Sequence, residues 1–436
     1  MTIESGKLWR NWGRSVSSTP ALVSRASSVE DVVETVRLAR ERDLTVRPIG
    51  AGHSFTAIAA TGGIQLDIAA LDGLLAVDGN LVTLGAGTNL YQLPALLQPH
   101  GLALANMGDI DAQTIAGATS TGTHGTGARF GGLATQIRAV DLVTAEGELM
   151  HISETENSDL LPAAKLGLGA LGVLVAVQIE CVPAFQLHAV EKPENAETVL
   201  HEWHERLAIN DHFEFYSWPH AELVSTKSNN RVPLDAAGKP LGRLQAWFDN
   251  AFMANTVFGA SLEVLRLMPA LIPPMNRLSV KLEANREFTD RSSSVFASQR
   301  TVRFRESEYA LPVEAVPDAL RAVHEVIAQR NWRISFPIEV RASAADDLWL
   351  STASGRATGY IAVHRFWRDD PTEYFREVEA IMRAHDGRPH WGKMHTRTAH
   401  DLRPAYPHFD DFVAVRNRLD PTRVFANDYL RAVLGE

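Results

Sequence analysis

The most informative stretch of this sequence reads Arg47-Pro-Ile-Gly-Ala-Gly-His-Ser-Phe55. A second stretch, residues 117–127, reads Gly-Ala-Thr-Ser-Thr-Gly-Thr-His-Gly-Thr-Gly. Glycines let backbone amides approach a ligand closely, and neighbouring Ser and Thr hydroxyls add hydrogen-bond donors. Each stretch alone is equally well explained as glycine turns between strands. The two together favour a cradle for a pyrophosphate group.

Neither stretch matches the dinucleotide-binding fingerprint of three glycines. Gly50 and Gly52 are followed by Phe55 where the third glycine belongs, and the similar pair at 85 and 87 is followed by Leu90. No long crossover helix follows either pair. A nicotinamide-type fold is therefore disfavoured.

The elements around the first stretch are short. Ser28 is a good N-cap, and an apolar stripe at helical spacing follows it to about Asp43. Residues 44–49 predict a strand that ends at the glycine loop. Further on, the pattern predicts strands at 64–68, 81–84 and 102–104, a helix at 90–98 that Gly101 ends, and a hairpin over 137–152. This part of the chain has the character of an α+β domain.

The amino-acid composition changes after Pro183, where glycine becomes sparser and tryptophan and arginine become more frequent. Strands are predicted at 333–341 and 359–367, and a helix at 371–385. We therefore expect two domains, 1–183 and 184–400, followed by a C-terminal segment, 401–436. A length of 436 residues fits such a division.

Composition narrows the class of protein. The formal net charge is -10, which argues against a nucleic acid partner. No apolar run approaches the length of a membrane span, and the N-terminus has no apolar core of a signal peptide, so a cytoplasmic protein is expected. Cys181 is the only cysteine, which excludes an intrachain disulfide and any cysteine-based metal site.

Glu339 and Arg341 are two residues apart in a predicted strand, so both side chains lie on one face. Such a pair can bind a polyol and stabilise developing negative charge, although the spacing alone is more typical of an ordinary surface ion pair. His364 alternates similarly in the next strand. By itself it would more often be a satisfied core histidine.

Three segments carry a resemblance to a known family: residues 47–54, residues 106–127 and His390-Trp-Gly-Lys393. Together they resemble the aldonolactone and alditol oxidase branch of the vanillyl-alcohol-oxidase superfamily. The resemblance implies an α+β, two-domain fold with an FAD-binding domain of the PCMH type and a substrate-binding cap domain, built on an antiparallel sheet with flanking helices. The C-terminal segment would pack back near the flavin.

The resemblance also implies the cofactor and its attachment. FAD would be bound covalently through His53, the histidine of the Gly-x-Gly-His-Ser motif, whereas a lone histidine there would otherwise be read as a structural hydrogen bonder. His124 would belong to the cradle. The other residues expected to contact FAD are Pro48, Ile49, Gly50, Ala51, Gly52, Ser54, Gly108, Asp109, Thr114, Gly117, Thr121, Gly122, Thr123 and Ile179.

In the family, four residues surround the reactive edge of the flavin, and they correspond here to Glu339, Arg341, His364 and Lys393. Arg341 and Lys393 would be electrostatic stabilisers, Glu339 would orient the substrate and His364 would be an acid/base candidate. The base itself stays open. The reaction implied is oxidation of a secondary alcohol of an aldono-1,4-lactone, of the L-gulono or D-arabinono type.

Three residues bear on specificity and on the electron acceptor. Phe366 and Asp109 stand where alditol oxidases have small hydroxyl residues, which favours lactones over open-chain polyols. Gly108 stands where, in this branch, glycine accompanies oxidases and alanine dehydrogenases, so oxygen is the expected acceptor and peroxide the product. An alditol oxidase, and a lactone dehydrogenase using another acceptor, remain the alternatives.

Other classes are less well supported. Gly387 and Lys393 have the spacing of a phosphate-binding P-loop, but Met394 replaces the Ser or Thr that would bind magnesium. A module that binds FAD without chemistry leaves the four candidate residues unexplained. His201 and His204 have the wrong spacing for a helical zinc motif, and no metal is predicted.

Overall fold

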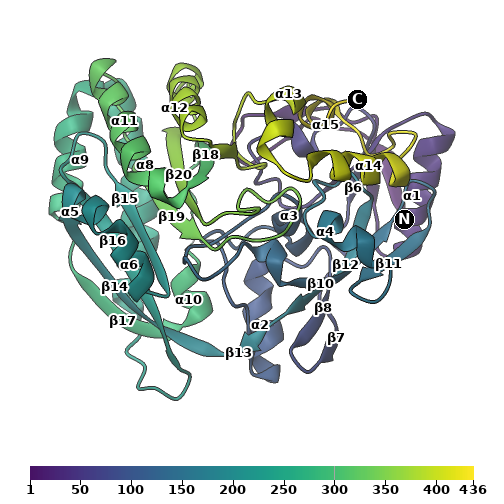
Figure 1. Ribbon diagram of the computed structural model, residues 1–436, viewed down its shortest axis with the longest axis horizontal. Helices are drawn as coiled ribbons and strands as arrows, with labels where there is room; N and C mark the ends of the chain where they lie inside the picture. The colour runs from purple at the N-terminus through teal and green to yellow at the C-terminus, as the bar shows by residue number, and fades with distance from the viewer. Residues whose placement is uncertain (299) are drawn as a thin grey trace.

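The computed structural model describes residues 1–298 and 300–436. Figure 1 shows two sheet-based halves side by side, with the C-terminal helices lying over the N-terminal half. Helices and sheets occur in both halves, and the second half is built on an antiparallel sheet, so the α+β class is confirmed.

The N-terminal half contains two main sheets. The first has the order β1-β4-β6-β5, with β4 and β5 both parallel to the central β6. The second is antiparallel, with the order β11-β10-β12-β8-β7. Their strands are β1 (Thr2–Ser5), β4 (Leu22–Arg25), β5 (Val46–Ile49), β6 (Ile64–Asp67), β7 (Leu74–Asp78), β8 (Leu81–Gly85), β10 (Ile137–Val143), β11 (Leu149–Ser153) and β12 (Val173–Glu180).

Local signals in the sequence fix several of these elements. Helix α1 (Val29–Glu41) begins after Ser28, whose Oγ accepts a hydrogen bond from the Asp31 amide at 3.3 Å. The helical segment over 90–100 ends at Gly101, which adopts a φ of 66° that favours glycine. The helix, the hairpin of β10 and β11, and the strand before the glycine loop are thus confirmed.

The second half is organised by one antiparallel sheet of eight strands, in the order β17-β14-β16-β15-β19-β20-β18-β21. Helices α11 and α12 pack side by side over its β19, β20 and β18 end (Figure 1). The strands are β14 (Phe185–Asn195), β15 (His212–Ser217), β16 (Leu223–Pro233), β17 (Arg286–Arg291), β18 (Phe304–Pro312), β19 (Ile338–Ser343), β20 (Thr358–Phe366) and β21 (Arg388–Pro389). The helices include α5 (Ala196–His201), α6 (Trp203–Ile209), α8 (Phe258–Leu267), α9 (Ile272–Lys281), α10 (Ser292–Phe296), α11 (Val316–Gln329) and α12 (Thr372–Ala384).

One predicted strand starts too early. The sequence predicted a strand from Arg333 to Arg341, whereas β19 begins at Ile338. Pro337 has no amide hydrogen to donate to a ladder, so the residues before it stay outside the sheet. Glu339 and Arg341 nevertheless lie within β19, on the face that the prediction required.

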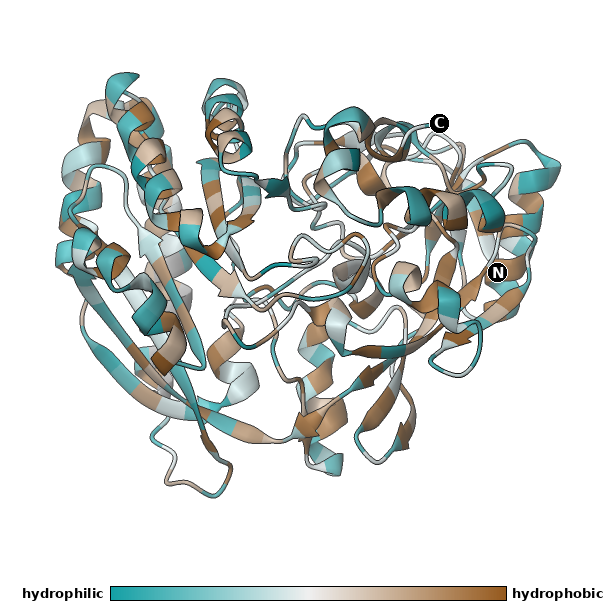
Figure 2. Cartoon of the chain, viewed as in Figure 1, coloured by the Kyte–Doolittle hydropathy of each residue, from teal (hydrophilic) through white to brown (hydrophobic). Residues whose placement is uncertain are grey.

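The C-terminal helices α13 (Ala399–Leu402), α14 (Phe409–Leu419) and α15 (Asp428–Leu434) complete the core of the first half. Phe412 and Leu430 belong to the same buried cluster as Val82 of β8 and Val177 of β12. Figure 2 shows hydrophobic stretches, in brown, along the strands and helices of this half. The two ends of the chain therefore fold together.

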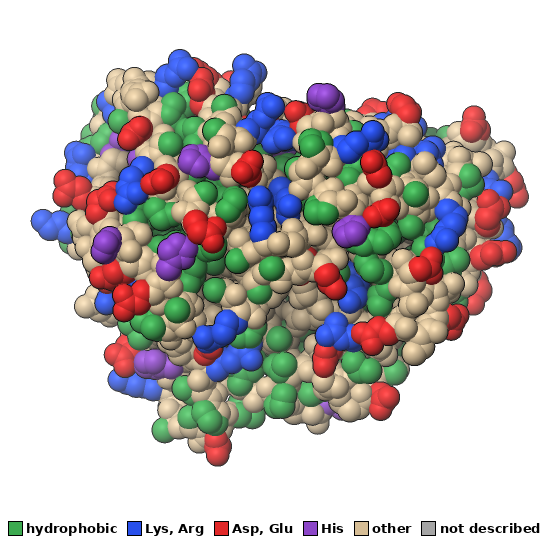
Figure 3. Space-filling view, viewed as in Figure 1, with side chains coloured by type: hydrophobic (Ala, Val, Ile, Leu, Met, Phe, Trp, Pro, Cys, Tyr) green, Lys and Arg blue, Asp and Glu red, His purple; other side chains and the backbone are tan. Residues whose placement is uncertain are grey.

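The outer surface carries mixed charge. On the face in Figure 3, Lys and Arg side chains are interspersed with Asp and Glu side chains. Within the described residues, no helix has both the length and the apolar character that crossing a membrane demands.

Candidate functional site

A cleft opens in the first half beside β5 and α3 (Ile115–Ser120), with about 810 Å³ of space, open solvent included, that protein atoms do not fill. The predicted cofactor residues from Pro48 to Ser54 line it, together with Thr114, Gly117 and Thr121. Its wall also contains residues that the sequence did not single out, namely Trp9, Ile58, Gln113, Ser120, Leu168 and Leu174. A mostly apolar lining with several glycines and a few polar side chains suits a cofactor.

At two glycines of the cleft wall, neighbouring atoms leave no room for a side chain. A Cβ on Gly50 would lie 2.4 Å from Thr114 Oγ1, and a Cβ on Gly172 would lie 2.5 Å from a methyl carbon of Leu142. Thr114 Oγ1 accepts from the Gly117 amide at 3.1 Å and so fixes the start of α3. The two glycine-rich stretches therefore meet at one wall, as a cradle requires.

Arg47 supports the cleft from behind. Its side chain is 2% exposed and donates to the backbone oxygens of Ile58, Leu168, Gly169 and Phe425. Burial lowers the pKa of Arg47 to about 10, which leaves it charged at neutral pH. Because these carbonyls occupy its donors, Arg47 fixes the turns that form the wall.

His53 lies in the cleft wall with its ring stacked on Trp12, the centroids 5.2 Å apart. Burial, helped by the nearby charge of Lys393, lowers the pKa of His53 to about 4. The imidazole is therefore neutral at pH 7 and keeps a nitrogen lone pair, which is what a nucleophile needs.

The remaining predicted cofactor residues lie outside the cleft wall. Gly108, Asp109, Gly122, Thr123 and His124 belong to the two loops that lead from the cleft toward the second half. Ile179 is fully buried in β12, opposite Val82 of β8, and belongs to the core.

Backbone hydrogen bonds join the two halves at this place. The Gly127 amide donates to Ala342 of β19 at 2.8 Å, and the Phe55 amide donates to Gly392 at 2.6 Å. The cleft, strand β19 and the His390-Trp-Gly-Lys393 segment are thereby held against each other.

Arg341 is the centre of a buried charged cluster in the second half. It is 7% exposed and forms an ion pair with Glu339, which is 6% exposed. Its Nε lies 3.4 Å from Glu214 and its terminal nitrogen 3.3 Å from Asp109. Burial opposes the charge of Arg341, but these three carboxylates raise its pKa well above the ordinary value.

The same cluster contains Tyr216 and Arg300. Tyr216 donates to Glu339 at 2.8 Å, and Arg300 pairs with the second oxygen of Asp109 at 3.2 Å. Burial raises the pKa of Glu339, partly offset by Arg341. Asp109 thus links the first half to β19 through Arg341 and to the loop before β18 through Arg300.

Lys393 and His364 meet at a further carboxylate, Glu306 of β18. Lys393 forms an ion pair with Glu306, and His364 Nε2 lies 3.6 Å from it. His364 Nδ1 lies 3.1 Å from the Pro337 carbonyl oxygen, so Nδ1 carries the proton that donates there. Burial lowers the pKa of Lys393, but Glu306 and Glu308 outweigh it and raise the pKa overall.

Five residues of this site were missed by sequence reasoning: Glu214, Tyr216, Arg300, Glu306 and Glu308. A signal existed for four of them, because 214 and 216, like 306 and 308, repeat the two-residue alternation that singled out Glu339 and Arg341. Arg300 lies in a loop and offered no comparable pattern.

Two groups in the described part of the chain have ligand atoms close enough for a metal: His124, Glu308 and His390, and Glu306, Glu339 and His364. In the second group the carboxylates already pair with Arg341 and Lys393, and in the first Glu308 already contacts His124. The P-loop alternative also fails structurally, because helix α12, rather than a strand, precedes Gly387.

Comparison with known proteins gives a consistent result. Residues 177–433 match the D-arabinono-1,4-lactone oxidase family, and residues 20–153 match an FAD binding domain. The chain is 43% identical to an L-gulono-1,4-lactone dehydrogenase of Mycobacterium tuberculosis, over 98% of this chain and 99% of the relative. It is 33% identical to the L-gulonolactone oxidase of Bos taurus, over 98% of both chains.

A Streptomyces alditol oxidase is 31% identical over 97% of this chain and 98% of its own. Among solved structures, the cholesterol oxidase of B. sterolicum superposes with a TM-score of 0.82, at 20% identity, over 99% of this chain and 97% of its own. At that identity the likeness concerns the fold. It confirms the expected arrangement of an FAD-binding half and a cap half.

Proposed function

The chain belongs to the D-arabinono-1,4-lactone oxidase family and carries its FAD-binding domain, and from this premise we propose that it oxidises a secondary alcohol of an aldono-1,4-lactone. The observation that carries the proposal is the junction of the two halves. There the cradle that contains His53 meets two cations, the buried Arg341 and the partly buried Lys393.

The substrate hydroxyl would lie among Glu339, Arg341 and Lys393. Arg341 Nε is buried and, within the described structure, makes no hydrogen bond, because its contact with Glu214 at 3.4 Å is an ion pair only. A buried unsatisfied donor is costly, and a substrate oxygen would satisfy it. Glu339, held by Tyr216, would orient the substrate.

FAD supplies the chemistry of hydride acceptance when it is bound. The residues of this chain would supply the proton transfer and the electrostatics. Arg341 and Lys393 would stabilise negative charge that develops on the substrate oxygen and near the cofactor. His364 offers only Nε2 for proton transfer, since Nδ1 donates to Pro337.

Covalent attachment through His53 is part of the proposal. The neutral imidazole in the cleft wall supports it, and Cys181, buried in the core, offers no alternative nucleophile in the cleft. Pro48 to Ser54, Thr114, Gly117 and Thr121 would hold FAD, and Gly108, Asp109, Gly122, Thr123 and His124 would extend the contact toward the cap half.

Oxygen is the proposed electron acceptor, supported by the absence of a Cβ at Gly108. A lactone dehydrogenase is the second candidate, because the relative that is 43% identical bears that name. An alditol oxidase is the third, but Phe366 packs with Phe55, Phe304 and Phe336 into an apolar cluster and offers an open-chain polyol no hydroxyl.

The test is a panel of L-gulono-1,4-lactone, D-arabinono-1,4-lactone, xylitol and sorbitol. Each is mixed with the purified protein without oxygen, and bleaching of the flavin absorbance is followed; peroxide is then measured in air. Lactones should bleach the flavin fastest and yield peroxide. Faster bleaching by the polyols would favour the alditol reading, and bleaching without peroxide would favour the dehydrogenase.

A further inference from the structure

Strand β18 carries two carboxylates on one face, Glu306 and Glu308, each 3% exposed. Strand alternation turns both toward the junction of the two halves, with Ser307 between them on the opposite face. Two buried carboxylates so close together repel each other and lose their hydration, so both need cationic partners. The partners come from three different segments of the chain.

Glu306 pairs with Lys393, which arrives on the C-terminal loop. The Met394 amide donates to the Glu306 carbonyl oxygen at 2.8 Å, so backbone and side chain of Glu306 both hold this loop. Burial would raise the pKa of Glu306, but Lys393 and His364 outweigh it and hold it at about 2. The carboxylate is therefore ionised, and Lys393 faces a full negative charge.

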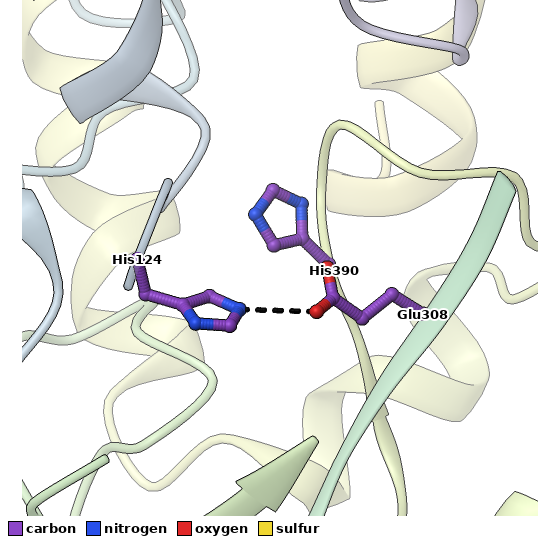
Figure 4. Close-up of side chains that lie close together, drawn as sticks. All are labelled: His124, Glu308 and His390. Carbon is purple, nitrogen blue, oxygen red and sulfur yellow. Dashed lines mark ion pairs between the residues drawn. The ribbon is translucent and has the colours of Figure 1, made fainter. Parts of the chain in front are cut away.

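Glu308 pairs with His124, which arrives on the glycine-rich loop (Figure 4). His124 Nε2 lies 3.2 Å from Glu308, and Nδ1 lies 2.8 Å from the Gly125 carbonyl oxygen. Burial opposes ionisation of Glu308, yet His124 lowers its pKa well below the ordinary value. His124 is thus held between the Glu308 carboxylate and the Gly125 carbonyl oxygen.

His390 completes this group but has a different state. Its Nδ1 accepts a hydrogen bond from the Gly392 amide at 3.0 Å, so the proton of the neutral ring is on Nε2. Burial lowers the pKa of His390 to about 3, which keeps it neutral at pH 7. With Nε2 protonated, His390 lacks the lone pair that a metal ligand at this position needs. The group is therefore an ionised Glu308 in contact with His124, beside a neutral His390.

We infer that Glu306 and Glu308 form a counter-charge pair that lowers the reduction potential of the bound FAD, by offsetting the charge of Lys393 and by placing a second negative charge against His124 at the junction of the two halves. A cation beside a flavin favours the reduced, anionic state, and a carboxylate against that cation in a low dielectric cancels most of its effect. The inference rests on the proposed function. Glu306 and Glu308 act through their partners and are positioning residues.

The test uses the FAD-containing full chain and two amide variants, Glu306→Gln and Glu308→Gln. Each variant keeps the shape of the side chain and removes one negative charge. The midpoint potential of the flavin is titrated spectroscopically at pH 7 with no substrate present. We expect a rise of about 30 mV or more in each variant, which for a two-electron couple is a tenfold shift toward the reduced form. Sulfite, which adds to electron-poor flavins, should bind about tenfold more tightly for the same reason.

A matched control is Glu191→Gln. Glu191 is a mostly buried, ion-paired carboxylate of the same sheet, but it pairs with Arg286 near the opposite edge. This variant should leave the potential unchanged. Glu306→Asp separates charge from shape: it keeps the charge, so its potential should stay near the wild-type value even if turnover falls.

The outcomes are distinguishable. Unchanged potential and sulfite affinity in FAD-containing Glu306→Gln or Glu308→Gln protein would overturn the inference, and the second variant decides if the first does not fold. A shift in Glu306→Asp equal to that in Glu306→Gln would overturn it too, since geometry would then be the cause. A flavin-containing protein that oxidises no lactone would contradict the proposed function but not this inference, because the midpoint potential and the sulfite affinity are both measured without substrate.

Discussion

His53 combines three properties of an attachment point: a place in the cleft wall, a ring stacked on Trp12 and a pKa lowered to about 4. We predict that acid-precipitated protein keeps its yellow colour and that a denaturing gel shows flavin fluorescence at the position of the chain. His53→Ala should release all flavin into the supernatant, because no other nucleophile would hold it. Ser54→Ala, also in the cleft wall, should retain it. Complete release from the wild-type chain would rule out the covalent bond.

Arg341 is the most heavily paired cation of the site. Arg341→Met should slow flavin reduction by lactone about 100- to 1000-fold, the effect of losing roughly 3 to 4 kcal/mol of transition-state stabilisation. The rate is measured by stopped-flow bleaching of the flavin without oxygen. The FAD content of the variant must be checked first, because three carboxylates lose their cationic partner. Arg321→Met, an exposed ion-paired arginine of α11, should react at the wild-type rate. A near-normal rate in Arg341→Met would contradict the assignment.

Gly108 is not required by backbone conformation, since its φ is outside the left-handed region. A Cβ there would lie 3.0 Å from the His124 carbonyl oxygen and 3.4 Å from a Thr123 methyl carbon, so a methyl group would tighten this loop contact. Gly108→Ala should slow reoxidation of the reduced protein by air at least about tenfold, a barrier increase of ~1.4 kcal/mol, with flavin reduction largely preserved.

A control for this variant lies on the neighbouring loop, which also contains Thr123 and His124. A Cβ on Gly132 would make ordinary contacts, at 3.4 Å with the Thr123 carbonyl oxygen and 3.5 Å with His124 Cβ. Gly132→Ala should therefore reoxidise like the wild type. Peroxide formation in air is the readout, and a wild-type protein that makes none would be a dehydrogenase.

Among the elements, the sequence predicted a strand correctly where the evidence was an alternation of neighbouring residues. Alternation placed Glu339 and Arg341 on one face of β19, and the two residues form an ion pair there. The same alternation in Glu306-Ser-Glu308 is typical of a solvated strand when read alone. Only the packing of the Lys393 and His124 loops against β18 buries it, and those contacts join residues far apart in the chain.

The sequence likewise could not predict which loops meet at the junction of the two halves. Asp109 was predicted to contact the cofactor, and its ion pairs with Arg300 and Arg341 join three segments that no local pattern relates. Pro337 shows the opposite case, because a local rule known in advance would have moved the start of β19 to its observed place.

Asn427 ties helix α15 to the cleft. Its Oδ1 accepts from the Leu430 amide at 2.9 Å, and its Nδ2 donates to the carbonyl oxygens of Ala57, Ile58 and Ala60. Asn427→Ala should cost roughly 2 to 4 kcal/mol, from a lost N-cap and unsatisfied carbonyls, and should weaken FAD binding because Ile58 lines the cleft.

Denaturant unfolding and the fraction of freshly purified chain that carries flavin measure this effect. Asn195 is a suitable control, because it caps α5 by accepting hydrogen bonds from the amide and hydroxyl of Thr198, and it lies far from the cleft in the sheet half. Asn195→Ala should cost only about 1 kcal/mol and leave FAD bound. Equal losses in the two variants would contradict a special role for Asn427.

At the scale of the whole molecule, the two ends of the chain and its middle form one site. The C-terminal segment closes the back of the cleft through Phe425 and Asn427, while β18, β19 and the Lys393 loop supply the charges. We propose the division 1–183, 184–400 and 401–436 on this basis. A fragment that lacks the last segment would have an incomplete cleft wall, so the segments are expected to depend on each other for stability.

The buried histidines make the stability of the whole chain depend on pH. Burial lowers the pKa of His212 to about 4 and that of His390 to about 3, and both side chains are almost fully buried. Between these values and the ordinary value near 6.5, the unfolded chain binds protons that the folded chain does not. Stability therefore falls as pH decreases from about 6.5 toward 4, by up to about 1.4 kcal/mol per pH unit for each such histidine. Glu339, whose pKa burial raises, acts in the opposite direction, so the test compares the slope of unfolding free energy against pH between the wild type and a variant.

His212→Asn should flatten the plot of unfolding free energy against pH by up to about 1.4 kcal/mol per pH unit between pH 6 and pH 4.5. His201→Asn, at an exposed position of α5, should leave the slope as it is in the wild type. Urea unfolding at four pH values gives the slopes, and parallel plots for the wild type and His212→Asn would show that His212 does not resist protonation in the folded protein.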